Sequence, residues 1–252
     1  MNNQPKSVEA TLLERRSIRR YEREPIPEAD MQFIYEAIRN TPTSYNGQQF
    51  SVIDIDDQTV KEKLYEITGQ KQIKTCNRFL VFCADYNKIS LIAREKGIPM
   101  PQFFDTLDGY TVGAVDAALA MMSAVTAAES RGLGTCCVGY ARTANPDAIS
   151  TLLKLPPHVA VICGLAIGVP RELPDLKPKQ SKDLLILHNE YSSDGMVERL
   201  ADYDREITHY NATREGTKST NDWAAHIIGY YNEAMNYTML DAMAHRGFHI
   251  RK

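Results

Sequence analysis

The stretch that most constrains the fold is residues 111–130, which is rich in alanine, methionine, leucine and valine. Its only formal charges are Asp116 and Glu129, and it ends at Arg131-Gly132. It is too polar and too bounded to cross a membrane, which takes roughly 20 apolar residues in succession. We therefore expect a core helix that is buried on most of its surface.

Hydrophobic periodicity predicts helices and strands that interleave along the rest of the chain. Helices are expected over residues 28–40, 59–67, 146–153, 196–210 and 223–245. Strands are expected over residues 50–55, 79–84, 135–139 and 159–169. Residues 169–182 carry three prolines and should form an extended surface crossing. Because the chain has no internal repeat or low-complexity tract, we expect a single domain over residues 1–252.

Composition excludes several classes of function. The net charge of −3 gives no global basic surface for nucleic acid or an anionic membrane, so any bound anion must be held by a local cluster. The amino terminus lacks the apolar core of a secretory signal, which favours a cytoplasmic protein. The five cysteines are odd in number and lie mostly in apolar runs, so we expect reduced thiols. Cysteine and histidine spacings do not predict a metal site.

The most informative local feature is residues 15–20, which place four arginines and a serine within six positions. Guanidinium groups match phosphate oxygens bidentately, and a hydroxyl adds a directional hydrogen bond. The run can therefore bind a phosphate-bearing ligand or form a solvated basic turn. Composition alone leaves both interpretations open.

Three further segments carry weaker signals. Residues 41–49 combine hydroxyls, amides and a glycine, a set that suits the edge of a flat heteroaromatic ring and equally an ordinary polar loop. Residues 132–140 contain glycines that permit close backbone approach, without the full spacing of a nucleotide motif. Lys177 and Lys179 flank a proline and gain meaning only if they close a phosphate site with the arginine run.

Nucleophilic catalysis has no good candidate in this sequence. A nucleophile elbow of the Gly-x-Ser-x-Gly type is missing. The adjacent thiols of Cys136 and Cys137 cannot be paired with a particular histidine, and small buried strand residues are the better interpretation.

In combination and in this order, the segments resemble the nitroreductase family of FMN-dependent oxidoreductases, in particular its NADPH-dependent branch. The resemblance extends from about Glu9 to the C-terminus. The matching motifs are Arg15-Arg16-Ser17-Ile18-Arg19, Ile67-Thr68-Gly69-Gln70, Phe79-Leu80-Val81-Phe82-Cys83-Ala84-Asp85, Ala128-Glu129-Ser130-Arg131-Gly132-Leu133-Gly134 and Asp175-Leu176-Lys177-Pro178-Lys179.

This resemblance implies an α+β fold with a central mixed sheet wrapped by helices. It also implies an intertwined homodimer with FMN at the subunit interface and with C-terminal segments that extend over the other subunit. The activity implied is NADPH-dependent reduction of nitroaromatics, quinones or free flavin by a ping-pong, two-electron mechanism. The flavin carries the chemistry, so the family pattern assigns no catalytic side chain.

The resemblance also assigns binding roles to individual residues. Arg16, Ser17 and Arg19 match the motif that grips the phosphate, ribityl chain and pyrimidine edge of FMN, and Arg15 stands where relatives often have histidine. The other positions that match flavin-binding segments are Thr43, Ser44, Tyr45, Gln48, Gln70, Val138, Gly139, Tyr140, Lys177 and Lys179. Tyr45 replaces a serine, Tyr140 a glycine, and Lys179 an arginine of the family pattern.

For the reductant, Arg214 matches a basic residue of a mobile loop that recognises the 2′-phosphate of NADPH, with Lys218 as a nearby substitute for a second arginine. Two other functions stay open. The protein could be a dedicated NADPH:FMN reductase that supplies reduced flavin, or a flavin-binding protein without significant turnover. The expected partners are a small-molecule electron acceptor and a second copy of the chain, without nucleic acid or membrane.

Overall fold

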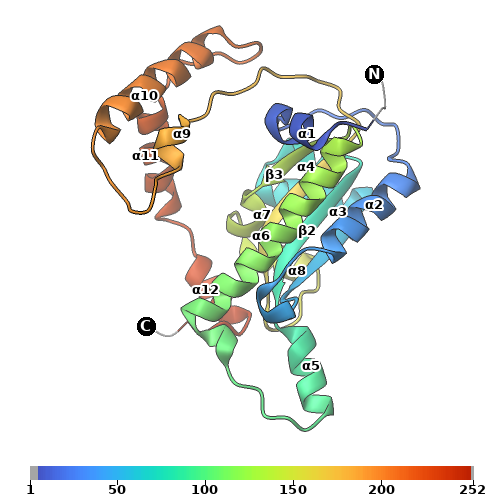
Figure 1. Ribbon diagram of the computed structural model, residues 1–252. Coiled ribbons are helices and arrows are strands. Elements are labelled where there is room, and N and C mark those ends of the chain that lie inside the picture. The colour runs from blue at the N-terminus through green and yellow to red at the C-terminus, as the bar shows by residue number, and fades with distance from the viewer. Residues whose placement is uncertain (1–4, 251–252) are drawn as a thin grey trace. The chain divides into compact units, whose positions relative to one another are not determined.

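The structure is a computed structural model that describes residues 5–250. The chain divides into two compact units. The first takes the chain up to Leu173 and resumes at Thr238, and the second runs from Pro174 to Tyr237. Figure 1 shows the sheet and its helices in the first unit and a set of helices in the second.

A four-stranded sheet organises the first unit, with its strands in the order β1-β2-β4-β3. The strands are β1 (Phe50–Ile55), β2 (Arg78–Asp85), β3 (Gly134–Val138) and β4 (Val159–Gly168). These strands pair antiparallel, and the edge of β3 adds a parallel bridge between Thr135 and Ser17. The predicted α+β class and the four predicted strands are thus confirmed.

Helices cover both faces of the sheet, and the alternation of β2 shows why. Phe79, Val81 and Cys83 point into one hydrophobic cluster, whereas Leu80 and Phe82 point into the other. Burial on both faces explains the continuous apolar run of this strand. One face packs on α2 (Glu28–Arg39) and α6 (Leu107–Ser130). The other face is covered by α3 (Gln58–Thr68), α4 (Lys71–Thr75), α7 (Tyr140–Thr143) and α8 (Pro146–Leu152).

The helix expected over residues 111–130 is α6, which packs on the sheet, but the expectation that most of its surface is buried is wrong. Its inner side packs on β2 and α2, whereas Val115, Leu119 and Met122 stay 50%, 43% and 42% exposed. The expectation that this stretch is too polar to cross a membrane is wrong as an argument from composition, because α6 is long and apolar enough to do so. Core helices of soluble proteins share this property.

Several helices were missed or mispredicted. The predicted helix over residues 223–245 is wrong as one element, because the chain forms α11 (Trp223–Ala234) and α12 (Met239–His245) with a break between them. Residues 171–181 are free of helix and strand, as expected of the proline-rich crossing. The other helices are α1 (Val8–Glu14), α5 (Asn87–Glu95), α9 (Lys182–Leu185) and α10 (Met196–Thr213), and the 3-10 turns are η1 (Ser44–Asn46) and η2 (Phe103–Asp105).

The C-terminal segment returns to the first unit and becomes part of its core. Phe248 is fully buried against an aromatic cluster that includes Tyr86 and Phe104. The Arg246 guanidinium donates to the Leu155 carbonyl at 2.9 Å, and the main-chain carbonyl of Arg246 accepts from the His158 N–H at 2.7 Å. This return explains the helix break, since the chain must leave α11 to reach the cluster.

Candidate functional site

The arginine run lies along the free edge of β3. The Ile18 N–H donates to the Thr135 carbonyl at 2.8 Å, and Ile18 itself is buried. The Tyr21 hydroxyl donates to the Ile18 carbonyl at 2.5 Å, and Glu22 bonds the backbone of Val169 beyond β4. The segment therefore has a fixed backbone, which the solvated-turn interpretation does not require.

Two guanidinium groups of this segment have an unsatisfied buried atom. The Nε atoms of Arg15 and Arg16 are buried without a hydrogen-bond partner in the part of the chain that the structure describes. A buried unpaired donor costs free energy, and an anion is the group that would satisfy these donors best. Glu129, which is buried beside this segment and accepts from the Thr135 hydroxyl at 2.6 Å, has a pKa raised by burial and lowered in part by Arg15.

Arg19 and Gln70 line one cavity of about 510 Å³, together with Arg20, Lys71 and Arg171. Glu172 fixes the run on this side, because its carboxylate accepts from the N–H groups of Arg19 at 2.7 Å and Arg20 at 3.2 Å. Gln70 precedes α4 directly after Gly69, whose φ of 68° ends α3 in the left-handed conformation that glycine adopts without strain. The structure thus brings two predicted site residues together from distant parts of the chain.

The turn after β3 offers open space. Val138 is buried at the end of the strand, whereas Gly139 is exposed and a Cβ atom there would meet no atom within 4 Å. Tyr140 begins α7 and is half-buried. Gly139 therefore leaves room for a group to lie against the backbone, which is what the resemblance implies for this turn.

The serine-containing loop is held in place by one buried carboxylate. Asp116 of α6 is 1% exposed and accepts from the N–H groups of Ser44 at 3.0 Å and Gln49 at 3.2 Å. The Thr43 hydroxyl accepts from the Gln48 N–H at 3.2 Å. Tyr45 has a φ of 56° and its side chain is 96% exposed. The loop backbone is therefore fixed by Asp116, while the Tyr45 side chain extends into solvent.

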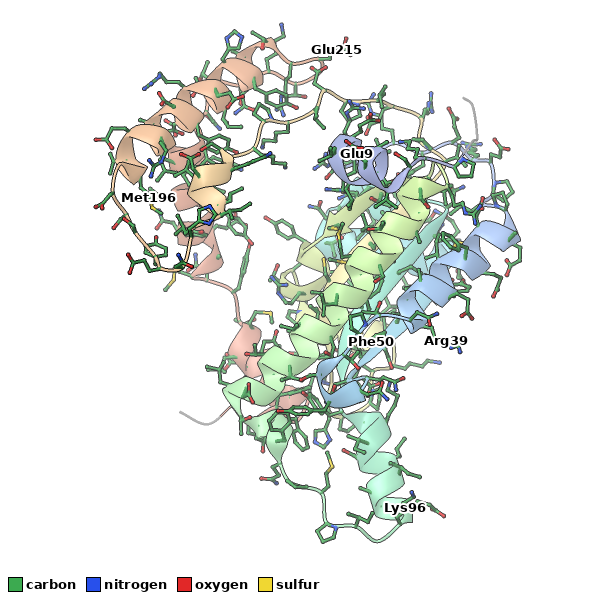
Figure 2. The ribbon with its side chains drawn as sticks, in the orientation of Figure 1. Glu9, Arg39, Phe50, Lys96, Met196 and Glu215 are labelled. Carbon is green, nitrogen blue, oxygen red and sulfur yellow. The ribbon has the colours of Figure 1, made fainter. Side chains whose placement is uncertain are left out.

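Within one chain, this loop and the arginine run lie at different positions along α6. Lys6, just before α1, bonds the carbonyl of Ser130 at the C-terminal end of α6, whereas the loop bonds Asp116. Fourteen residues of α helix correspond to about 21 Å. In Figure 2, Glu9, which precedes the arginine run, and Phe50, which follows the loop, lie at different positions along α6. The two groups of predicted site residues are thus not brought together in the single chain.

The four remaining predicted residues lie in the second unit. The segment that carries Lys177 and Lys179 is tied to α10, because the Tyr203 hydroxyl donates to the Pro178 carbonyl at 3.4 Å. Beyond α10, the Arg214 Nε donates to the Thr217 carbonyl at 2.8 Å, and Lys218 is exposed. Their roles toward a phosphate or a reductant stay predictions.

Comparison with known proteins gives matches over nearly the whole chain. The model of the nitroreductase family matches residues 12–169, and the model of its C-terminal domain matches residues 177–251. The chain belongs to the nitroreductase family. The FMN reductase (NAD(P)H) of Bacillus subtilis is 33% identical over 96% of this chain and 98% of its own length. The oxygen-insensitive NADPH nitroreductase of Salmonella typhimurium is 36% identical over 84% of this chain and 85% of its own length.

Solved structures of this family have the same fold. The hypothetical oxidoreductase YcnD of Bacillus subtilis superposes with a TM-score of 0.93 at 33% identity and covers all of both chains. The NADPH:FMN oxidoreductase of Vibrio harveyi, solved in complex with NAD+, gives a TM-score of 0.84 at 25% identity and covers 97% of this chain and 99% of its own. The expected nitroreductase fold is therefore confirmed.

Sequence reasoning on this nitroreductase missed residues that shape the site. Asp116 has no assigned role in the sequence motifs, although a lone carboxylate in an apolar helix signals a buried hydrogen-bond acceptor. Arg171 and Glu172, which follow β4, carried no local signal because their role depends on strand pairing. Groups of three or more histidine, cysteine or acidic side chains suited to a metal ion are missing from residues 5–250.

Proposed function

We propose that this nitroreductase is an FMN-dependent NADPH oxidoreductase that reduces small acceptors, namely nitroaromatics, quinones or free flavin, by a ping-pong two-electron mechanism. The single observation that carries the proposal is the pair of buried, unpartnered Nε atoms in Arg15 and Arg16. They lie in the run that resembles the family's phosphate-binding motif. The names of the relatives, FMN reductase and NADPH nitroreductase, support the same activity.

The residues present fit a bound FMN. Arg15, Arg16 and Ser17 offer a fixed set of donors to its phosphate, and Arg19 and Gln70 share a cavity where its polar ring edge would bind. The open side of Gly139 leaves space for the ring against backbone. Lys177 and Lys179 would add positive charge to the phosphate site.

Bound isoalloxazine would supply the redox chemistry, since it accepts a hydride from a nicotinamide and passes two electrons to an acceptor. The protein would bind, orient and stabilise charge. Arg19 would favour negative charge at the adjoining ring edge through electrostatic attraction. Val138, Gly139 and Tyr140 would fix the ring from the β3 turn, and Arg214 with Lys218 would hold the 2′-phosphate of NADPH.

We also propose that the functional unit is a homodimer in the cytoplasm, with one domain per subunit. Thr43, Ser44, Tyr45 and Gln48 belong to the loop that Asp116 holds, about 21 Å along α6 from Ser130. The arginine run binds Thr135, which contacts Glu129 at that far end of the helix, so a second chain would have to bring its own loop to the site. The exposed apolar residues of α6 continue into a groove with α1 and α2 of about 490 Å³. Such a surface suits a self-complementary interface.

Purification with excess FMN, followed by absorbance and anaerobic mixing with NADPH, tests the proposal. We expect a yellow protein that NADPH bleaches rapidly and a nitrofuran or quinone reoxidises. A preparation that stays colourless after reconstitution would rule out the flavin site. Retained FMN without bleaching would instead indicate a flavin-binding protein without turnover.

A dedicated FMN reductase is the second candidate, favoured by the names of two Bacillus subtilis relatives. Turnover numbers on free FMN, a quinone and a nitrofuran separate the two functions. Efficient turnover with free FMN alone would identify the dedicated reductase. Comparable turnover with all three would support the broader oxidoreductase.

A further inference from the structure

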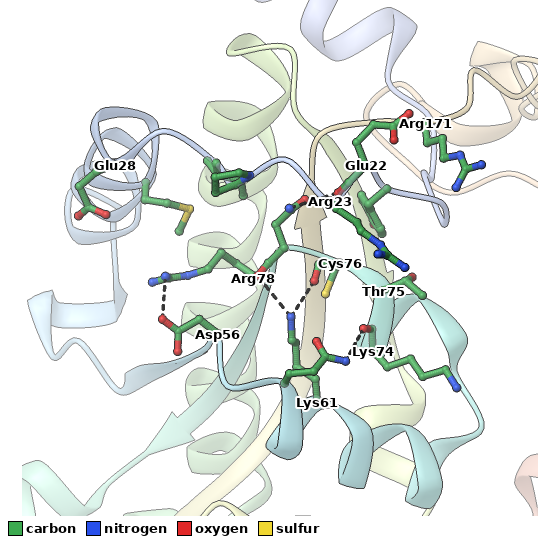
Figure 3. A pocket seen from close by; sticks show the side chains of 16 residues that line it. Glu22, Arg23, Glu28, Asp56, Lys61, Lys74, Thr75, Cys76, Arg78 and Arg171 are labelled. Atoms are coloured by element: carbon green, nitrogen blue, oxygen red, sulfur yellow. Dashed lines mark hydrogen bonds and ion pairs between the residues drawn. The ribbon is translucent and has the colours of Figure 1, made fainter.

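A second, larger cavity of the first unit lies apart from the residues proposed to hold FMN phosphate. It measures about 1070 Å³ and is shown in Figure 3. Arg15, Arg16 and Ser17 do not line it, although Tyr21, Thr75 and Arg171 also line the smaller cavity with Arg19. The nitroreductase activity as proposed leaves this cavity without a role.

A buried lysine forms the floor of the cavity. Lys61 of α3 is 5% exposed, and its Nζ donates to the Cys76 carbonyl at 2.8 Å and the Asn77 carbonyl at 3.5 Å (Figure 3). Carbonyl oxygens satisfy the hydrogen bonds of an ammonium group but do not neutralise its charge. Within the described chain, Lys61 takes part in none of the ion pairs. Its charge therefore stays available to attract an anion.

The rim of the cavity has a fixed backbone. The Asn77 side-chain amide donates to the carbonyls of Glu22 at 3.3 Å and Glu24 at 2.6 Å, and its oxygen accepts from the Val169 N–H at 3.1 Å. Arg23 lies between the two bonded carbonyls, and Figure 3 shows its guanidinium over Thr75. The position of this arginine thus follows from main-chain anchoring rather than from a carboxylate partner.

The charges of the lining do not balance. Arg78 pairs with Asp56 at 3.1 Å. The remaining basic groups, Arg23, Lys61, Lys74 and Arg171, outnumber the remaining acids, Glu22 and Glu28. In the described chain, none of these four basic groups takes part in an ion pair. A local excess of positive charge in a protein of net charge −3 is a physical signal for an anionic ligand.

We propose that this cavity is a second anion site that binds a small molecule carrying a diphosphate or comparable phosphate groups. Arg23 offers a bidentate fork, and Lys61 offers an ammonium charge from the floor. Lys74, whose Nζ lies 3.8 Å from the centroid of the Tyr65 ring, adds positive charge beside the wall. The volume slightly exceeds that of most small-molecule pockets, so a ligand of nucleotide size fits. The site stands apart from the proposed function, because it needs neither FMN chemistry nor NADPH.

Calorimetric titration of the protein with inorganic pyrophosphate tests the site. The protein is kept in excess FMN, so that the flavin phosphate site is occupied, and ionic strength is held constant. We expect pyrophosphate to bind the unmodified chain and to bind the double variant Arg23→Gln, Lys74→Gln at least tenfold more weakly. Neither side chain forms an ion pair, Arg23 is exposed, and Lys74 loses only its contact with the Tyr65 ring, so the variant should fold.

Two control variants locate the binding. Arg94→Gln with Lys96→Gln removes two exposed cations at the C-terminal end of α5, outside the cavity, and should leave pyrophosphate affinity unchanged. Arg214→Gln removes a cation of the second unit and should also leave it unchanged. Absence of pyrophosphate binding, an equal loss in the α5 control, or a loss confined to Arg214→Gln would overturn the proposal. The single variant Arg23→Gln repeats the test with the least perturbation of the fold.

Discussion

At the scale of single residues, the arginines of residues 15–20 differ in their surroundings and therefore in what they can bind. Arg20 lies 3.6 Å from the Glu172 carboxylate and is largely exposed, an arrangement that contributes little free energy in water. Arg15 and Arg16 instead have buried Nε atoms without a partner. Composition could identify the run but could not separate these arginines, because the difference arises from how the segment pairs with β3.

Removal of the Arg16 guanidinium group should weaken flavin binding. We expect Arg16→Ala to raise the dissociation constant for FMN about 10- to 100-fold, because a charge-assisted contact contributes about 1.5–3 kcal/mol. Quenching of FMN fluorescence measures the affinity. Arg94→Ala, an exposed arginine on α5, serves as the matched control. Unchanged FMN affinity in Arg16→Ala would contradict its assignment to the phosphate.

A half-buried tyrosine, Tyr35, should make stability depend on alkaline pH. Burial and the hydrogen bond to Asp54 raise the pKa of Tyr35 from 10 to about 12, and Arg78 donates to its hydroxyl at 2.7 Å. The folded state then holds this proton more tightly than the unfolded state. The stabilisation is complete below pH 10 and is lost as pH rises through 12.

The variant Tyr35→Phe tests this dependence. Its free energy of unfolding in urea should fall less steeply between pH 10 and pH 12 than that of the unmodified chain, since the group that titrates is gone. Tyr191→Phe, at a tyrosine that is 78% exposed, provides the comparison. Parallel pH profiles for Tyr35→Phe and the unmodified chain would exclude this role.

At the scale of elements, hydrophobic periodicity predicted the helices and strands whose buried residues recur at regular spacing. The helix predicted at residues 28–40 is α2, and the strand at 50–55 is β1. The helix break after α11 was missed because neither proline nor glycine marks it; the return of Phe248 to the core determines it. Of the predicted site residues in the first unit, Arg19 and Gln70 share a cavity, whereas the loop of Thr43 to Gln48 is held at Asp116, away from the arginine run.

The loop before β1 should depend on its anchor in α6. In Asp116→Asn an amide replaces the carboxylate, so one of the N–H groups of Ser44 and Gln49 loses its acceptor. The free energy of unfolding should fall by about 1–3 kcal/mol, the cost of an unsatisfied buried donor. Urea denaturation measures it, with Glu95→Gln at the exposed end of α5 as control. Equal stability of the two variants would mean that Asp116 does not hold the loop.

The exposed face of α6 should mediate self-association. Leu119→Lys places a charge in the middle of this apolar surface, where burial without a partner is costly. We expect sedimentation equilibrium to give twice 28.4 kDa for the unmodified chain and a shift toward 28.4 kDa for the variant. Ile92→Lys changes an equally exposed residue on α5 and should leave the mass unchanged. A variant that stays fully dimeric would place the interface elsewhere.

At the scale of the whole molecule, the first unit is built from two separate parts of the chain. The sheet and its helices come from the part before Pro174, and the aromatic cluster is completed by residues after Tyr237. A linear sequence pattern does not reveal such an arrangement. The pairing of distant segments depends on which apolar surfaces meet, and Phe248 gave no signal beyond its hydrophobicity.

Loss of the aromatic anchor should therefore destabilise the sheet unit. We expect Phe248→Ala to lower its free energy of unfolding by about 3–5 kcal/mol, as is typical when a buried aromatic side chain is truncated. Urea denaturation followed by tyrosine fluorescence measures the change. Leu240→Ala, at a residue of α12 that is 65% exposed, should cost well under 1 kcal/mol. A similar loss of unfolding free energy in the two variants would show that the packing of Phe248 in the first unit is dispensable.

The double attachment of residues 174–237 has a consequence for how this chain can be shortened. Because the polypeptide re-enters the first unit at Thr238, the second unit is an insertion rather than a tail. A stop codon after Tyr237 would remove Phe248 together with everything else beyond it. Excision of residues 174–237 with a short linker would keep both ends of the sheet unit. Internal excision, and not truncation, is the route by which evolution or an experimenter could exchange this segment.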